Sequence, residues 1–439
     1  MRKYILLSIA VVFATTGFAQ KKAKPTVNTL IKKADVERII KTLSADDMQG
    51  RATFTPGIEK AAQFIESEYK KIGLKPMEGN TGYRQNFTMI KTSPVKTEVS
   101  INGVNIAADK LAISGSSPFS WSKLEDTEIV KITADKDLRA EYMKLLKSGK
   151  NTLVLIDPKF EPMFDRIQSR YLNGSVAFKD QAGKSSQSLV FVLGTFDEVK
   201  SFTANYDVKS EEPPLFNIAG IIPGKTKPNE YVVFSGHYDH LGILKPMEGD
   251  SIANGADDDA SGTTAVISLA RYYKKMHNNA RTLIFVAFTA EEIGEFGSQY
   301  FAKTVDANKV VAMFNIEMIG KASKFGENSA FITGYERSDF GPILQKNLKG
   351  TKFKFYPDPY PTQNLFYRSD NASLAKVGVP AHTISTDQID IDKYYHTVKD
   401  ELSTLDVNNI TSTIRAIALS SKTIVSAHDT PKRIPKLEE

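Results

Sequence analysis

The sequence predicts an α/β protein whose mixed, mostly parallel sheet is flanked by helices on both faces and interrupted by an inserted smaller domain. From Leu215 onward, short apolar runs typical of buried strands alternate with amphipathic segments typical of helices. Residues 95–214 differ: they contain strand-like runs, no histidine and no recognisable catalytic cluster. The length of 439 residues also exceeds what a small single-core domain needs. We therefore expect a main domain formed by residues 20–94 and 215–439, with the inserted domain at 95–214.

Hydrophobic periodicity places the individual elements. Residues 34–43 carry apolar side chains at helical spacing, and a second helix is expected from Pro56 to a stop at Gly73. Inside the insertion, strands are expected at 99–104, 152–156 and 188–193. The later elements are strands at 218–222, 231–235, 282–288, 310–316 and 379–384, a helix after Gly262, and one final helix spanning roughly 407–426.

The charge balance and the absence of cysteine restrict the function. The formal net charge is +6, but lysine and arginine are scattered among acidic residues without a basic block, so nucleic acid is not an expected partner. A chain without cysteine forms no disulfide and carries no lipidated cysteine. Any metal ligands must therefore be histidine, aspartate or glutamate.

The first nineteen residues have the pattern of a signal peptide. Arg2 and Lys3 precede an apolar run at 4–13, and Gly17 and Ala19 occupy the small-residue positions of a cleavage site. The run is too short to span a membrane comfortably, and no later segment is long and apolar enough. We expect cleavage after Ala19, export to the periplasm or the cell exterior, and no stable membrane anchor.

A dense polar cluster follows the apolar run at 231–234. It begins with His237-Tyr238-Asp239-His240 and continues, after a loop, with Asp257-Asp258-Asp259. Taken alone, a His-x-Asp pair is more often a hydrogen-bonded strand-end histidine, and a single aspartate before a helix is more often a cap. Three adjacent aspartates exceed what a cap needs and repel one another, which favours a bound cation.

Further ionisable side chains follow other predicted strands. Glu291 and Glu292 come after the strand at 282–288, Glu317 comes after the strand at 310–316, and His396 lies beyond an acidic loop. Each has an ordinary alternative, such as a solvated loop or a salt bridge. Because ligands of open α/β sheets bind beyond the carboxyl ends of the strands, the coincidence predicts one shared site.

In this order, the motifs resemble the co-catalytic dizinc aminopeptidase family, which also includes relatives of glutamate carboxypeptidase and the glutaminyl cyclases. The similarity covers roughly Leu215 to the C-terminus plus the helices between Ala34 and Pro76, and members of the family often insert a protease-associated domain where the insertion is predicted. The resemblance implies two zinc ions bridged by Asp258. It implies His237, Asp258 and Glu317 as ligands of one ion and Asp258, Glu292 and His396 as ligands of the other. It further implies Glu291 as the general base and Asp239 as the partner that orients His237.

The expected function is hydrolysis of the N-terminal peptide bond of peptides by a zinc-bound hydroxide, with Glu291 taking its proton. Many of these aminopeptidases have aspartate at the position of Glu317, and Tyr367 or Arg368 could polarise the substrate carbonyl or hold a carboxylate. A carboxypeptidase or a glutaminyl cyclase with the same metal cage, and a non-catalytic binding relative, therefore stay open as alternatives. Side-chain preference and oligomeric state are not predicted.

Overall fold

The computed structural model describes residues 25–172, 174–182 and 187–437. The predicted signal peptide at 1–19 lies outside these residues. Within them, every helix is too short or too polar to span a lipid bilayer.

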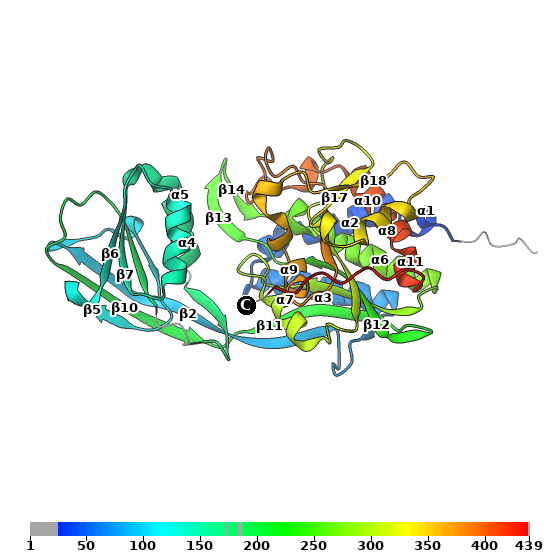
Figure 1. The fold of residues 1–439 in the computed structure, drawn as a ribbon, viewed down its shortest axis with the longest axis horizontal. Coiled ribbons are helices and arrows are strands. Elements are labelled where there is room, and N and C mark those ends of the chain that lie inside the picture. The colour runs from blue at the N-terminus through cyan, green and yellow to red at the C-terminus, as the bar shows by residue number, and fades with distance from the viewer. Residues whose placement is uncertain (1–24, 173, 183–186, 438–439) are drawn as a thin grey trace, which may run out of the picture.

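A large mixed sheet runs through the whole molecule (Figure 1). Its strands are β1 Lys75–Pro76, β2 Arg84–Ile101, β3 Val104–Asn105, β5 Phe119–Trp121, β8 Ser175–Phe178, β10 Phe202–Glu211, β11 Pro214–Ile222, β12 Lys227–His237, β15 Arg281–Phe288, β16 Val310–Ile316, β17 Ser329–Ile332, β18 Lys354–Pro357 and β19 Ala381–Ser385. The main path is β18-β17-β19-β16-β12-β15-β11-β2-β10-β5. At its centre β12 pairs in parallel with both β15 and β16, and β16 with β19, whereas β11 and β17 pair antiparallel with their neighbours β15 and β19. The predicted fold class is confirmed.

Helices cover both faces of this sheet. They are α1 Val27–Leu30, α2 Lys33–Leu43, α3 Pro56–Ile72, α6 Gly262–Met276, α7 Phe296–Thr304, α8 Phe340–Asn347, α9 Asn371–Ala375, α10 Val407–Ser420 and α11 Lys422–Val425. Phe234, in β12, belongs to the core shared with α2, α3, α6, α8 and α10. Its neighbour Val233 belongs to the opposite core, which contains Phe301 of α7 and Leu374 of α9. Consecutive strand residues point to opposite faces, so an all-apolar strand requires a helix layer on each side.

The helix boundaries agree with their local chemistry. Pro56 occupies the first turn of α3, and Gly73 ends the helix with a φ of 78°, a conformation that glycine adopts without strain.

The prediction of one final helix at 407–426 is wrong in one respect: α10 ends at Ser420 and α11 begins at Lys422. The hydroxyl of Ser421 donates to the carbonyl of Ile417, which competes with regular helix continuation there.

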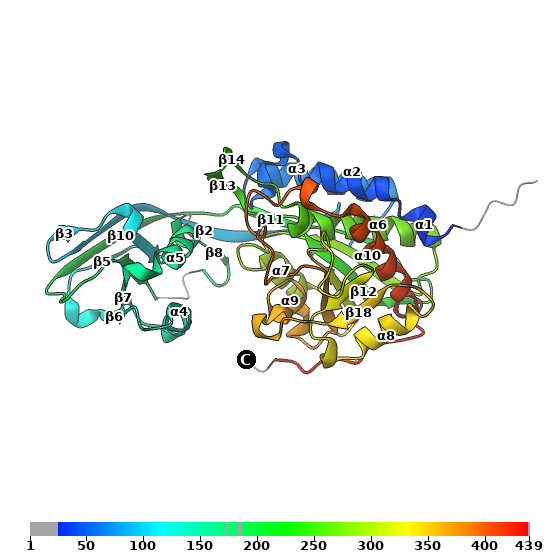
Figure 2. The same cartoon turned by 90° about the horizontal axis from the view of Figure 1, so that it is seen from above.

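The segment predicted as an insertion contains a second sheet, with the order β4-β9-β7-β6. Its strands are β4 Leu111–Ser114, β6 Glu128–Ile132, β7 Thr152–Ile156 and β9 Leu189–Leu193. The helices of this segment are α4 Leu138–Ser148 and α5 Glu161–Leu172. Strand β2 connects the two parts: its first residues pair with β11 and its later residues pair with β10. A continuous strand therefore crosses the predicted boundary at residue 95. Figure 2 shows β2 passing between the two parts.

Helix α6 starts in close contact with the end of β16. A Cβ atom on Gly262 would lie 2.0 Å from the carbonyl oxygen of Ile316 and 2.4 Å from a carboxylate oxygen of Asp259. Both neighbours are buried, so neither can move aside freely. The absence of a side chain at Gly262 thus fixes the distance between the segment carrying Asp258 and the strand that leads to Glu317.

We predict that Gly262→Ala lowers the free energy of unfolding by about 1–3 kcal/mol, because the added methyl overpacks this contact. Gly82→Ala is the matched control, since a Cβ there meets no atom within 4 Å, and it should change stability by less than about 0.5 kcal/mol. Urea unfolding followed by far-UV circular dichroism measures both. Equal stability of the two variants would show that the α6–β16 contact is not tight.

Candidate metal centre

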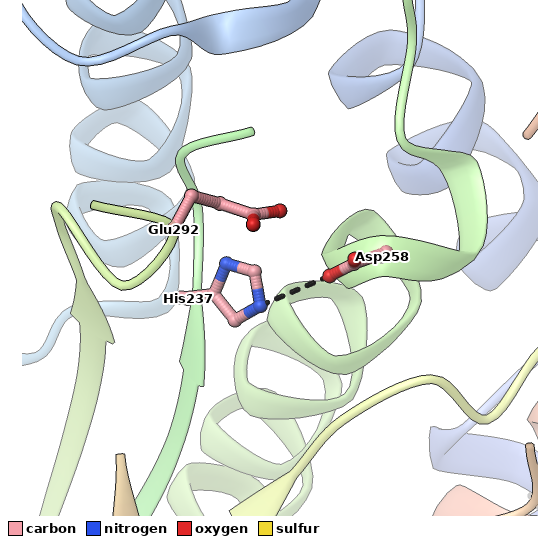
Figure 3. Close-up of side chains that lie close together, drawn as sticks. All are labelled: His237, Asp258 and Glu292. Carbon is pink, nitrogen blue, oxygen red and sulfur yellow. Dashed lines mark ion pairs between the residues drawn. The ribbon is translucent and has the colours of Figure 1, made fainter. Parts of the chain in front are cut away.

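Three side chains from three elements form the centre of the site (Figure 3). His237 is the last residue of β12, Asp258 lies in the irregular turn Ala256–Ser261 before α6, and Glu292 follows β15. The Nε2 atom of His237 lies 3.1 Å from Oδ1 of Asp258. One potential ligand atom from each residue lies within 4.8 Å of the other two, so the three side chains can share one ion.

The carboxylate of Asp258 lies between two histidines. Its Oδ1 faces His237, while its Oδ2 lies 3.2 Å from Nε2 of His396, which is also 3.2 Å from Oε2 of Glu292. Burial by itself raises the pKa of Asp258, but hydrogen bonds from both histidines bring that pKa well below its usual range. Asp258 is therefore an anion with one oxygen directed to each half of the site, the arrangement that a bridging ligand requires.

Glu317 enters the site one residue beyond the end of β16. Its Oε2 accepts a hydrogen bond from the hydroxyl of Ser369 and lies 3.5 Å from the amide nitrogen of Asn315. Burial and the charge of Asp258 raise the pKa of Glu317, His237 and the hydrogen bond from Ser369 lower it, and the net result is a pKa of about 7. The carboxylate of Glu317 thus interacts electrostatically with His237 and Asp258, the other two predicted ligands of the first zinc ion. Contacts with Ser369 and Asn315 hold that carboxylate in place.

Glu291 lies beside His237, one of the ligand candidates. Its Oε2 lies 3.9 Å from Nε2 of His237, and 12% of the side chain is exposed. Burial raises the pKa of Glu291 well above its usual value, and the neighbouring carboxylates of Glu317 and Glu292 raise it further. A carboxylate with a raised pKa accepts a proton more readily than an ordinary glutamate does.

Asp239 contacts both His237 and the backbone of the two glutamates. The Nδ1 atom of His237 lies 3.2 Å from the backbone carbonyl oxygen of Asp239 and 3.8 Å from its carboxylate, so the backbone is the nearer partner. The Asp239 carboxylate instead accepts hydrogen bonds from the backbone nitrogens of Glu291 and Glu292. Asp239 therefore positions the two glutamates directly and His237 mainly through the chain.

The two outer aspartates of the triplet are tied to the backbone. Asp259 accepts hydrogen bonds from the backbone nitrogens of His237, Gly262 and Met318. Asp257 accepts one from the backbone nitrogen of Gly320. The triplet therefore consists of one ligand candidate flanked by two residues that join the site-bearing segments, and only the middle charge is directed to the histidines.

Two residues that the sequence analysis did not assign complete this framework. His240 places Nδ1 at 2.7 Å from Oε1 of Glu292, which leaves Oε2 for His396. Asp400, four residues after His396, accepts hydrogen bonds from the backbone nitrogens of Asp257 and Asp258. His240 stood within the analysed motif and could have been found there, whereas no local pattern distinguishes Asp400.

Arg51 is a third residue that the sequence did not reveal. Its side chain is completely buried, and it donates hydrogen bonds to four backbone carbonyls: those of Leu43, Tyr238, Asn254 and Gly255. Burial lowers the pKa of Arg51, while Asp400 and Asp258 counteract that shift. The guanidinium joins the segment before α3 to both loops of the site and adds a positive charge behind the carboxylates.

We predict that Arg51→Met lowers the free energy of unfolding by about 3 kcal/mol or more, because it leaves four buried carbonyls without donors. Arg139→Met, on the exposed face of α4, is the control and should change stability by less than about 0.5 kcal/mol. Guanidinium unfolding compares the two. A loss below 1 kcal/mol for Arg51→Met would contradict the structural role of this residue.

A small cavity adjoins Glu317. Its lining includes apolar side chains, Ser369, Tyr395 and three ionisable residues, which are Glu317 itself, an exposed Arg368 and a buried Asp387. Tyr367, the other predicted substrate contact, is not among the described lining residues; its ring packs against Phe366 and lies under Arg337. Tyr395, which the sequence analysis did not assign, stacks on His396 with 3.8 Å between ring centroids.

The described side chains fit a zinc centre. The donors are imidazole nitrogens and carboxylate oxygens, which zinc accepts in four-coordinate sites. The Nε2 atom of His237 is buried and lies within 4 Å of the carboxylates of both Asp258 and Glu291. A second acidic group, Asp257, Asp387 and Asp392, could also hold a cation, but the ammonium of Lys321 already lies 2.5 Å from Asp392 and 3.3 Å from Asp257. The His237–Asp258–Glu292 group is thus the better metal site.

Comparisons with known proteins agree with this geometry. Residues 217–420 match the family described as "Peptidase family M28". Leucine aminopeptidase 1 of Ajellomyces capsulatus (strain H88) is 28% identical over 289 residues, which cover 62% of this chain and 70% of that protein. A probable zinc metalloprotease of Pyrenophora teres f. teres (strain 0-1) is 33% identical over 129 residues, covering 29% of this chain and 26% of that protein.

A solved structure has the same fold over nearly the full length. The aminopeptidase from Aneurinibacillus sp. strain AM-1 aligns with a TM-score of 0.59 at 17% identity, covering 94% of this chain and 97% of that one. This likeness agrees with the predicted fold. The family match and the sequence relatives confirm the predicted family resemblance and the prediction of a metallopeptidase enzyme.

Proposed function

Because residues 217–420 match peptidase family M28, we propose that this chain is an exported aminopeptidase that holds two zinc ions and removes the N-terminal residue of peptides. The observation that carries the proposal is the position of Asp258, with one carboxylate oxygen at 3.1 Å from His237 and the other at 3.2 Å from His396. The export part of the proposal rests on the signal-peptide pattern of residues 1–19.

In this proposal each ion takes one histidine and two carboxylates. His237, Asp258 and Glu317 hold the first zinc, and Asp258, Glu292 and His396 hold the second. Zinc, when bound, polarises the scissile carbonyl and lowers the pKa of a water molecule to about 7. His396 is the most exposed of the five ligands, with 38% of its side chain accessible, so the second half of the site opens to solvent and substrate.

The chain's own side chains perform the proton transfers. Glu291 accepts the proton of the attacking water and returns it to the leaving amine. Hydrogen bonds from the backbone of Glu291 and Glu292 to Asp239 keep the base beside His237. The free α-amine of the substrate lies near Glu317. The side chain of the substrate's first residue enters the adjoining cavity, whose walls include Phe331, Leu365 and Ile389.

We predict that Glu291→Gln reduces kcat on leucinamide by about 10²- to 10⁴-fold, because the amide cannot accept the proton, while zinc binding is retained. Steady-state kinetics and metal analysis on the same preparation measure both quantities. Turnover within fivefold of the wild-type rate would refute the role of Glu291 as the base.

We predict two zinc ions per chain in the dialysed wild-type protein and about one in either His237→Ala or His396→Ala, since each variant removes one ligand of one ion. His428→Ala, which alters an exposed histidine bonded to Ser426, is the control and should keep two. Inductively coupled plasma mass spectrometry gives the ratio. A single zinc in the wild-type protein that is lost completely in both variants would contradict the dinuclear assignment.

Arg368 favours one competing function. Its guanidinium lines the same cavity as Glu317, where it could pair with the terminal carboxylate of a peptide, as a carboxypeptidase requires. A peptide mixture read by mass spectrometry separates the two activities. The proposed aminopeptidase cleaves peptides blocked at the C-terminus but not peptides blocked at the N-terminus, and a carboxypeptidase shows the opposite pattern.

A further inference from the structure

A short hairpin connects two of the chain segments that carry residues of the metal centre. Strand β13 Gly242–Met247 begins two residues after His240, and β14 Asp250–Ala253 ends five residues before Asp258. The connecting residues Glu248 and Gly249 both have positive φ angles, of 53° and 87°, as a tight two-residue hairpin turn requires. Figure 1 shows the hairpin standing out from the main domain on the side of the inserted domain.

This hairpin exposes large apolar side chains beside the site. Ile243 is 61% exposed and Met247 is 45% exposed. Ile243 is the cross-strand partner of Ile252, so the two isoleucines share a face of the hairpin. Ile293, which directly follows Glu292, is 40% exposed. The contact between His240 and Glu292 brings these two segments together, so the exposed apolar residues border one end of the metal centre.

The base of the hairpin is held rigidly. A Cβ atom on Gly50 would lie 2.5 Å from the carbonyl oxygen of Ala253 and 2.7 Å from the Cα atom of Gly242, so the chain packs directly against both strands. At the tip, the ammonium of Lys399 lies 2.7 Å from the carboxylate of Glu248 and links the hairpin to the loop that carries His396. The hairpin is therefore packed tightly at its base and joined at its tip to the loop that carries His396.

The direction of a bound peptide follows from the two ends of the site. The cavity lies at the end marked by Glu317 and Ser369. His240 and Glu292, from which the hairpin and Ile293 extend, lie on the other side of Asp258. A peptide whose first residue occupies the cavity therefore runs past Asp258 toward the exposed apolar side chains.

We propose that the β13–β14 hairpin, through Ile243 and Met247, together with Ile293, binds apolar side chains of the residues that follow the scissile bond. The inference rests on the proposed aminopeptidase activity and specifies its substrate class: peptides whose second and third residues are apolar. Burial of such side chains against the hairpin removes apolar surface of both partners from water, which favours these peptides over polar ones by about tenfold or more in kcat/KM.

The test compares leucinamide, Leu-Leu-Phe-amide and Leu-Ser-Ser-amide as substrates of the wild-type enzyme and of the double variant Ile243→Ser/Met247→Ser. The wild-type enzyme should prefer Leu-Leu-Phe-amide to Leu-Ser-Ser-amide at least tenfold, and the double variant should lose most of that ratio. Val104→Ser, an equally exposed valine in the insertion, is the control and should keep the wild-type ratio. Thermal unfolding of each variant verifies the fold.

The outcomes separate this inference from the proposed function. If the wild-type enzyme releases leucine from all three substrates without preferring the apolar peptide, or if the double variant keeps the wild-type ratio, the hairpin is not a binding surface and the inference is overturned alone. If the wild-type enzyme releases leucine from none of them, the aminopeptidase activity is refuted and the inference falls with it.

Discussion

The structure depends on how it accommodates several carboxylates buried at one edge of a sheet. Asp239, Asp258 and Asp259 are almost inaccessible to solvent, and Glu291, Glu292 and Glu317 lie beside them. Two unit charges 4 Å apart interact by roughly 4 kcal/mol at the effective dielectric constant of a protein surface, so such a cluster needs compensating groups. Backbone N–H groups satisfy Asp239 and Asp259, Arg51 supplies a buried positive charge, and the histidines and two proposed zinc ions compensate Asp258, Glu292 and Glu317.

The different partners of the three aspartates explain the triplet better than their charge alone. In the sequence, the mutual repulsion of three adjacent carboxylates favours a bound cation. In the structure, Asp257 and Asp259 accept hydrogen bonds from Gly320 and Met318, directly beyond Glu317, so they fasten the turn before α6 to the end of β16. Only Asp258 is left to face the histidines. The outer two aspartates thus set the geometry in which the middle one can bridge.

The sequence predicts the parts of the site that lie on long, strongly apolar strands. His237 and Glu317 each end or follow such a strand, and parallel neighbours bring their carboxyl ends together, so their convergence could be expected. Arg51 could not be predicted, because its partners are carbonyls up to 204 residues away. Nor could the β13–β14 hairpin, since its strands are short and one contains a proline. The sequence also could not show whether the carbonyl or the carboxylate of Asp239 lies nearer to His237. In the structure the carbonyl is nearer.

X-ray diffraction from crystals of the zinc-loaded protein, with anomalous data collected on both sides of the zinc absorption edge, tests the central claim most directly. The account predicts two strong anomalous peaks, one on each side of the Asp258 carboxylate, the first near Nε2 of His237 and the second near Nε2 of His396. Peaks confined to the Asp257–Asp387–Asp392 group, or none in contact with Asp258, would contradict it.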